Sequence, residues 1–173
     1  MAGTGADPLA ATLLADMLLI VWHSRTGASR AMADAAALGA ASGGRLIAAE
    51  LAQPDDFLAA SGYLFAGPEN LGALSGAMKE MLDRNYYPLL GRIAGRPYAS
   101  MIAAGSDGQG AQAQLDRILT GWRLKRVAPP MIINVAAQTS EEILAEKQLG
   151  SEILANCTNL GAAMAEALQT GIF

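Results

Sequence analysis

The sequence has little of several residue classes, and each scarcity excludes a kind of protein. Its single cysteine, Cys157, cannot form an internal disulfide, which favours a reducing, cytoplasmic setting. Charged residues make up only 16% of the 173 residues, and the formal net charge is −4. Because nucleic-acid binders need a basic surface, this balance argues against a general nucleic-acid-binding role. Backbone amides can still hold an anion locally.

Long apolar runs are also missing. The run Leu18–Trp22 is far shorter than the roughly 20 apolar residues that span a bilayer, so we expect no membrane association. The segment Met1–Asp16 carries no Lys or Arg and therefore lacks the basic start of a secretory signal. The apolar content of 52% is enough for a sizeable core. We expect a flexible tail over residues 1–12 and one domain over residues 13–173.

Short apolar runs alternate with longer helical patterns along the chain. Strands are expected at Met17–Trp22, Arg45–Ala49, Gly62–Ala66, Tyr98–Ala104 and Met131–Val135. Helices are expected at Ala28–Ala40, Ala73–Asn85, Gln109–Trp122 and Ser140–Thr170, with a short turn of helix near Asp55–Ala60. This alternation predicts an α/β fold with a parallel sheet covered by helices on both faces. Cys157 falls on the apolar stripe of the last helix, where a small core residue is expected.

The first strand is followed by a turn that is suited to an anion. The apolar run ends at His23 and continues as Ser24-Arg25-Thr26-Gly27-Ala28-Ser29, where an alanine-rich helix begins. Such a turn offers free backbone amides, hydroxyl groups and the positive end of a helix dipole. These groups together form an anion site, most naturally for a phosphate.

Two further loops with ligand-type residues follow strands, and all three are expected at one sheet edge. The second loop runs over residues 67–76, and the third over residues 105–110. In an open parallel sheet, ligands bind outside the carboxyl ends of the strands. No G-x-x-x-x-G-K-[ST] motif is present. The third loop has the pattern G-x-x-G-x-G instead of the Rossmann pattern G-x-G-x-x-G, and it follows the fourth predicted strand rather than the first. A nucleoside-triphosphate loop and a Rossmann fingerprint are therefore both missing.

The first and second loops resemble motifs of the flavodoxin-like superfamily. The resemblance is closest to its NADPH-dependent FMN reductases and to the tryptophan-repressor-binding-protein type of quinone reductase. The first loop matches S/T-x-T-G-x-S/T at Ser24, Thr26, Gly27 and Ser29. A second signature is matched in register at Gly67, Pro68, Gly72, Ser75, Gly76, Lys79, Asp83 and Arg84. The resemblance implies a flavodoxin-like three-layer sandwich with a five-stranded parallel sheet in the order 2-1-3-4-5.

The resemblance also implies that the three loops bind FMN. The phosphate would be held by Ser24, Arg25, Thr26, Gly27, Ala28 and Ser29. The edge of the isoalloxazine ring would be contacted by Pro68, Glu69, Asn70, Leu71 and Gly72. The other side of the ring would be closed by Ser106, Asp107, Gly108 and Gln109. No catalytic side chain is assigned, because the cofactor carries the chemistry. No metal ligand is assigned, because Cys157 has no second cysteine or nearby histidine beside it in the sequence.

Departures from the family pattern bear on the activity. Neither the second nor the third loop has an aromatic residue to stack on the flavin, and an open ring face suits a nicotinamide. Glu69 argues against a nicotinamide-dependent reductase, because a carboxylate near the ring would disfavour reduced, anionic flavin and repel a dinucleotide phosphate. The third loop is short, so we expect the acceptor pocket to be completed by a partner subunit or to be poorly formed.

These features lead to ranked hypotheses. The first is an FMN-dependent oxidoreductase in which NADPH or NADH reduces the flavin, and the flavin reduces a quinone, another flavin or a similar small acceptor. The alternative is a flavodoxin-like electron-transfer protein without nicotinamide activity. A third is a degenerate interaction module that has lost FMN. A homo-oligomer is expected in keeping with the family.

Several other conspicuous residues favour structural roles. His23 is expected to make a local hydrogen bond at the end of its strand, although a catalytic base is the alternative. Asp83 and Arg84 are expected to form helix-surface pairs. Arg92 and Arg96 suggest a solvated surface, with attraction of a dinucleotide phosphate as the alternative.

Overall fold

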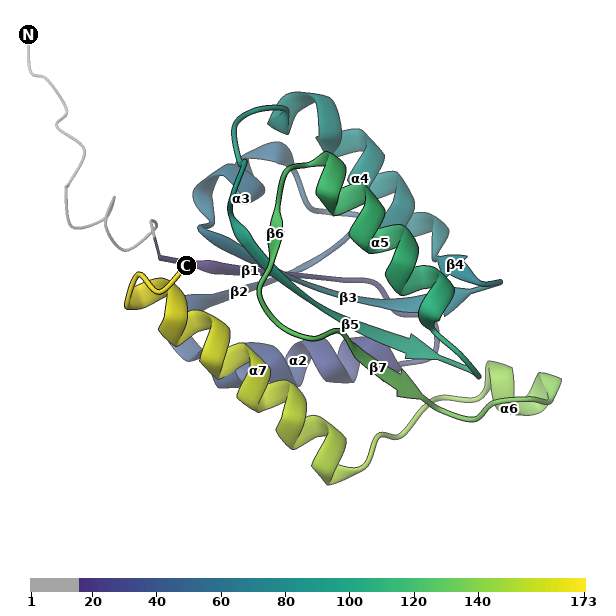
Figure 1. The fold of residues 1–173 in the computed structure, drawn as a ribbon. Helices are drawn as coiled ribbons and strands as arrows, with labels where there is room; N and C mark the ends of the chain where they lie inside the picture. The colour runs from purple at the N-terminus through teal and green to yellow at the C-terminus, as the bar shows by residue number, and fades with distance from the viewer. Residues whose placement is uncertain (1–15) are drawn as a thin grey trace, which may run out of the picture.

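The structure is a computed structural model that describes residues 16–173, so the predicted tail over residues 1–12 lies outside the described part. Strands and helices alternate along the chain (Figure 1). The strands are β1 (Leu18–Trp22), β2 (Gly44–Ala48), β3 (Gly62–Asn70), β4 (Ala73–Leu74), β5 (Pro97–Ala104), β6 (Lys125–Arg126) and β7 (Met131–Asn134). The helices are α2 (Ala28–Ala40), α3 (Pro54–Ala59), α4 (Gly76–Leu89), α5 (Gln109–Gly121), α6 (Ser140–Leu144) and α7 (Ser151–Gln169), with a 3₁₀ turn at Ala41–Gly43.

The predicted strand order is confirmed, and the sheet has two strands beyond the five predicted, β6 and β4. The parallel strands lie in the order β2-β1-β3-β5, and both β6 and β7 pair with β5 at its other side. The fifth position is thus shared by two short strands, which the segment 127–130 separates. Pro129 and Pro130 lie in this segment, and proline has no amide to donate to a ladder. The second addition is β4, which pairs with β3 in the antiparallel direction.

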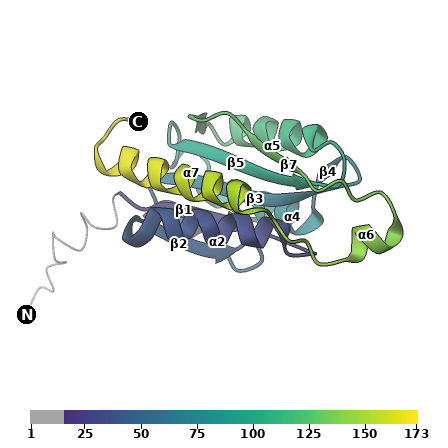
Figure 2. The ribbon, with the colours of Figure 1, turned by 90° about the horizontal axis from the view of Figure 1, so that it is seen from below.

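Alternation along the strands divides the core into two halves. Leu18 and Ile20 pack with α2 and α7, whereas Leu19 and Val21 pack with side chains of α3, α4 and α5. This follows from the period of two in a strand, since successive side chains point to opposite faces. Figure 2 shows α2 and α7 together on one face of the sheet. The result is the expected arrangement of helix, sheet and helix.

The two helices on the first face approach closely through glycines. A Cβ atom built on Gly161 of α7 would lie 2.0 Å from the carbonyl oxygen of Ala36 in α2. A Cβ on Gly39 of α2 would lie 1.9 Å from the carbonyl oxygen of Thr158 in α7. Only hydrogen fits at both positions, so these glycines set the distance between the helices. Cys157 is buried in the same layer, as predicted.

The arginines singled out in the sequence have structural partners. Arg84 pairs with Glu80 at 2.8 Å and also donates to the carbonyl oxygen of Ala52 at 2.7 Å. Arg96 donates to carbonyl oxygens at the end of α3, including that of Phe57 at 2.8 Å. It lies next to Pro97, at the amino end of β5, so it is at the opposite edge of the sheet from the phosphate-type loop. In the structure, the Arg96 guanidinium is thus engaged by the end of α3.

The single helix predicted over Ser140–Thr170 is also wrong. The chain forms the short α6, leaves the helical conformation at Ala145 with ψ of 147°, and resumes helical structure only at Ser151. In a continuous helix the amide of Lys147 would donate to the carbonyl of Ile143. Here it donates to the carbonyl oxygen of Thr26 at 2.7 Å, and the Lys147 ammonium contacts the Ile143 carbonyl instead, at 3.2 Å. Among residues 16–173, no helix has the length and apolarity required to cross a membrane.

Candidate functional site

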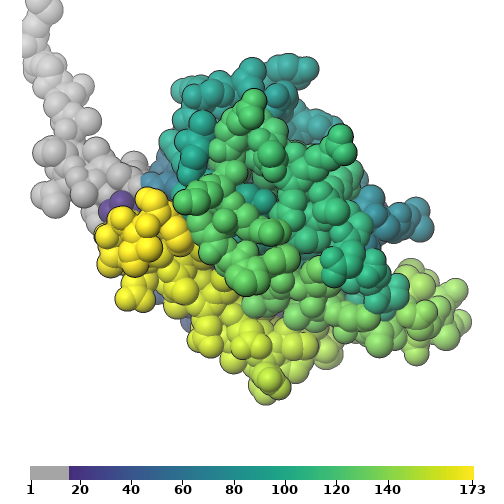
Figure 3. Space-filling view, in the orientation of Figure 1, coloured from purple at the N-terminus to yellow at the C-terminus, as the bar shows by residue number. Residues whose placement is uncertain are grey.

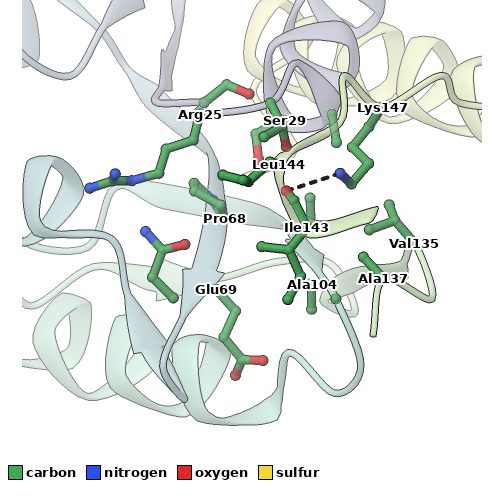
Figure 4. Close-up of a pocket in the computed structure, with 16 residues that line it drawn as sticks. Arg25, Ser29, Pro68, Glu69, Ala104, Val135, Ala137, Ile143, Leu144 and Lys147 are labelled. Carbon is green, nitrogen blue, oxygen red and sulfur yellow. Dashed lines mark hydrogen bonds between the residues drawn. The ribbon is translucent and has the colours of Figure 1, made fainter. Parts of the chain in front are cut away.

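A cavity of about 480 Å³ lies at the carboxyl edge of the sheet, between the loop after β1 and the carboxyl ends of β3 and β5 (Figure 4). This volume is within the range of about 300–1,000 Å³ that is typical of small-molecule sites. The cavity is lined by Ser24, Arg25, Thr26, Ala28, Ser29, Pro68, Glu69, Asn70, Ala103, Ala104, Gly105, Val135, Ala137, Ile143, Leu144 and Lys147. The first two predicted loops therefore converge on one cavity.

The loop between β1 and α2 forms an open helix N-terminus at the cavity. Gly27 precedes the helix with φ of 94°, a left-handed conformation that favours glycine. Its amide donates to the Ser24 hydroxyl at 3.1 Å, which closes the turn. Within the part of the chain that the structure describes, no side chain caps α2, so the amides of its first turn keep their capacity to bind an acceptor. Gly27 shapes the loop but does not itself line the cavity.

Ser29 is the most informative residue of this loop. It is 1% exposed, and its hydroxyl has no hydrogen-bond partner among the described residues. A buried hydroxyl without a partner costs about 1–3 kcal/mol, so native proteins rarely leave one. Because Ser29 lines the cavity, a ligand with acceptor oxygens could satisfy it.

The second loop differs from the prediction, because β3 runs on to Asn70. The chain then turns back into β4 through Leu71 and Gly72, whose φ values are 52° and 72°. Positive φ at both turn residues is the requirement of a type I′ hairpin. Pro68, Glu69 and Asn70 line the cavity, whereas Leu71 and Gly72 lie outside it. Leu71 is fully exposed at the tip of the hairpin.

The carboxylate of Glu69 is directed at the start of α5. It accepts hydrogen bonds from the amide of Gly108 at 2.7 Å and from the amide of Ala111 at 3.2 Å. Figure 4 shows it pointing away from Ser29 and Leu144. An acidic group at a helix N-terminus is stabilised by the free amides and by the helix dipole. The expected conflict between this carboxylate and a bound anion is therefore reduced by the α5 amides that it binds.

The third loop is turned toward the hairpin rather than the cavity. A Cβ on Gly110 would lie 2.1 Å from the carbonyl oxygen of Gly72, so the start of α5 packs directly on the hairpin turn. Of this loop, only Gly105 lines the cavity. The predicted ring-closing residues all lie outside it: Ser106, Asp107, Gly108 and Gln109. Gly108 is the N-cap of α5, at φ of 87°, and Gln109 is the first residue of this helix.

The rest of the cavity wall comes from the segment 136–150, which we call the α6 strap. Its cavity residues were not predicted from the sequence, and neither was the neighbouring Val135; they are Ala137, Ile143, Leu144 and Lys147. This segment of the same chain supplies one wall of the cavity. That a partner subunit completes the acceptor pocket, or that this pocket is poorly formed, remains a prediction. Thr139 and Glu142 form a capping box, and this S/T-x-x-E pattern could have indicated a separate short helix.

His23 lies beside the first loop and makes the predicted local hydrogen bond. Its Nδ1 and the hydroxyl of Ser75 are 2.8 Å apart, and its Nε2 is 3.6 Å from the carboxylate of Glu50. Burial lowers the pKa of His23 below 6.5; the charge of Arg25 also lowers it, and Glu50 opposes the change. Because Ser75 is completely buried, it has no access to a substrate, and this arrangement is structural.

Solved structures provide the comparison with known proteins. No protein-family model matches the chain, and no curated protein matches its sequence. A flavodoxin from the domain Archaea superposes with a TM-score of 0.73 at 17% identity, over 88% of this chain and 99% of that one. The chain has the flavodoxin-like fold. At this level of identity, the likeness shows the fold alone.

Two further matches have the same fold in different settings. The flavodoxin, WrbA-like protein from Agrobacterium tumefaciens gives a TM-score of 0.63 at 17% identity, over 88% of this chain and 97% of that one. The flavodiiron protein from Giardia intestinalis gives 0.70 at 18% identity, over 90% of this chain and 36% of that one. The chain thus spans about a third of that larger protein.

Proposed function

We propose that this protein binds FMN in the cavity and acts as a redox protein. The observation that carries the proposal is the buried, unpartnered hydroxyl of Ser29 at the uncapped N-terminus of α2. A phosphate accepts hydrogen bonds from hydroxyl and amide groups and is favoured by the helix dipole. FMN carries such a group, and the residues of the first loop fit it.

The remaining walls fit a flat, partly apolar ring. Ala103, Ala104 and Gly105 at the end of β5 have small side chains or none, so a planar group can approach the backbone. Pro68 and Asn70 form the wall at the end of β3. With its oxygen toward Arg25, the Asn70 amide accepts from Arg25 Nε at 3.2 Å, which fixes both side chains at the cavity mouth. When bound, FMN would supply the electron-transfer chemistry, and the protein would bind and orient it.

Two observations favour different electron donors. The α6 strap lies over the cavity, which leaves less room for a second ring and favours an electron carrier that exchanges with a protein partner. No aromatic side chain of the described residues lines the cavity, which favours NADPH or NADH as donor, because no aromatic group competes for the ring face. In that second candidate function, the final acceptor is a quinone, a flavin or a similar small molecule.

The test begins with cofactor binding to the full chain. Titration with FMN should give saturable binding, and riboflavin should bind at least about tenfold more weakly because it lacks the phosphate that the first loop would hold. Equal affinity for FMN and riboflavin would contradict the assignment of that loop, and failure to bind FMN would contradict the proposed function.

The donor is then tested under anaerobic conditions. Bleaching of the bound flavin within seconds of adding NADPH or NADH would support the reductase. Bleaching by dithionite but not by either nucleotide would support the electron carrier.

A further inference from the structure

The α6 strap presents two large apolar side chains that the protein itself leaves uncovered. Ile143 is 53% exposed and Leu144 is 78% exposed, yet both line the cavity. No residue of α6 is buried, so hydrophobic packing within the chain does not account for the position of this helix. Apolar side chains directed into a cavity of ligand size indicate that the packing partner is a ligand.

Hydrogen bonds at both ends of α6 nevertheless give the strap a defined conformation. At the start of α6, the amide of Glu142 donates to the Thr139 hydroxyl at 3.2 Å, and the amide of Thr139 donates to the Glu142 carboxylate at 3.0 Å. At its end, the Lys147 ammonium donates to the carbonyl of Ile143 at 3.2 Å (Figure 4). A five-residue helix is too short to persist by itself, so these caps hold its shape.

Two backbone hydrogen bonds fix the strap to the loops of the cavity. On one side, the amide of Ala137 donates to the carbonyl of Gly105 at 3.0 Å, at the end of β5. On the other side, the amide of Lys147 donates to the carbonyl of Thr26 at 2.7 Å, in the proposed phosphate loop. The strap therefore bridges the ring end and the phosphate end of the cavity. In Figure 3, α6 lies in the yellow-green protrusion at the lower right of the molecule.

We infer that Ile143 and Leu144 pack on the ring system of the bound cofactor and take the place of an aromatic stacking residue. This inference rests on the proposed function, because it needs a flat, partly apolar ligand in the cavity. The geometry points to these two side chains because they are the large aliphatic groups of the strap that line the cavity. Contact with a ring would bury both, and each buried aliphatic side chain contributes to affinity in proportion to its area.

The test compares the full chain with the double variant Ile143→Ala/Leu144→Ala. Because both side chains are exposed without ligand, the free energy of unfolding without FMN should be unchanged. The affinity for FMN should fall by about 10- to 100-fold. The visible absorption band of the bound flavin should also lose fine structure, because the ring would become more solvated. The matched control is Leu38→Ala, which truncates a leucine that is 76% exposed on α2, outside the cavity, and should leave affinity unchanged.

The outcomes separate the two proposals. If the unmodified chain binds no FMN, the proposed function and this inference both fail. If it binds FMN and the double variant binds with the same affinity and the same spectrum, only this inference is overturned. If the double variant loses stability without ligand, the single variants Ile143→Ala and Leu144→Ala replace it, and each should lower the affinity for FMN several-fold. Unchanged affinity in both single variants, or a loss of affinity in Leu38→Ala, would equally contradict the inference.

Discussion

The backbone amide of Lys147 donates to the carbonyl oxygen of Thr26 at 2.7 Å, and this bond joins the α6 strap to the loop after β1. The same residue places its ammonium group on carbonyls at the end of α6, including that of Ile143 at 3.2 Å. Lys147 thus fixes the strap by its backbone and ends the helix by its side chain. The wall of the cavity depends on both contacts.

Lys147→Ala tests this double role. The variant keeps the backbone bond but removes the positive charge from the α6 carbonyls, an interaction worth about 0.3–1 kcal/mol. Amide hydrogen exchange at Ile143 and Ala145, measured by NMR, should therefore accelerate roughly two- to fivefold. Lys79→Ala, which removes a surface pair with Asp83 on α4, is the control and should not change exchange in the strap. Unchanged exchange in Lys147→Ala would show that the ammonium does not hold α6.

Ser29→Ala should have opposite effects on stability and on binding. Without ligand, removal of a buried, unpartnered hydroxyl should stabilise the protein by about 1 kcal/mol in urea unfolding. Affinity for FMN should fall roughly tenfold or more, because a hydrogen bond to a charged group is lost. Ser106→Ala is the control, since Ser106 lies outside the cavity and should not affect calorimetric titration. A larger loss of affinity in Ser106→Ala than in Ser29→Ala would reverse the assignment of the loops.

Glu69→Ala should lower stability through the start of α5. The variant leaves the amides of Gly108 and Ala111 without their acceptor, and loss of such a cap costs about 1–2 kcal/mol. The free energy of unfolding in urea measures this loss. Glu166→Ala removes an exposed glutamate from the surface of α7 and should change stability by no more than about 0.5 kcal/mol. Similar values for the two variants would argue against the capping role.

Gly161→Ala tests the close approach of α2 and α7. The new Cβ would lie 2.0 Å from the carbonyl oxygen of Ala36, so the helices must separate, at a cost of about 1–3 kcal/mol. Gly121→Ala is the matched control, because no atom from the rest of the described chain, beyond its neighbours in α5, lies within 4 Å of its Cβ position. Thermal unfolding should show a lower Tm for Gly161→Ala and an unchanged or slightly raised Tm for Gly121→Ala. A neutral Gly161→Ala would mean that the helices adjust freely.

The lowered pKa of His23 predicts how stability changes with pH. Burial favours the neutral ring in the folded state, so below pH 6.5 the unfolded chain binds more protons than the folded one. The contribution of this group is fully present above pH 6.5 and is lost as the pH falls through the folded-state pKa. Urea unfolding between pH 8 and pH 5 should therefore show a smaller loss of stability in His23→Gln than in the original chain. A parallel loss in both proteins would exclude His23 as the titrating group.

Local patterns in the sequence predicted the elements that short-range interactions govern. The predicted helix Ala28–Ala40 has the observed bounds of α2, because Gly27 and the following alanine-rich stretch fix its start locally. The central strands β1, β3 and β5 were predicted because buried parallel strands appear as apolar runs. The strand order was implied by family resemblance rather than by any single pattern, and it is confirmed.

The predictions that were wrong or incomplete concern residues whose hydrogen-bond partners lie far away in the sequence. The residues after Ser140 do have a helical periodicity. However, the amide of Lys147 donates to the carbonyl oxygen of Thr26 instead of to a carbonyl of its own helix. Glu69 in isolation is an acidic loop residue near a candidate anion site. Its role as the cap of α5 depends on how β3 and α5 are placed relative to each other.

The sequence by itself therefore determined the alternation of strands and helices and the anion-type turn after β1, since both depend on neighbours a few residues apart. Only the tertiary structure decided which loops line the cavity and that the α6 strap closes one wall of it. The physical reason is that each backbone amide and each buried hydroxyl needs a partner, and in this protein the decisive partners come from remote parts of the chain.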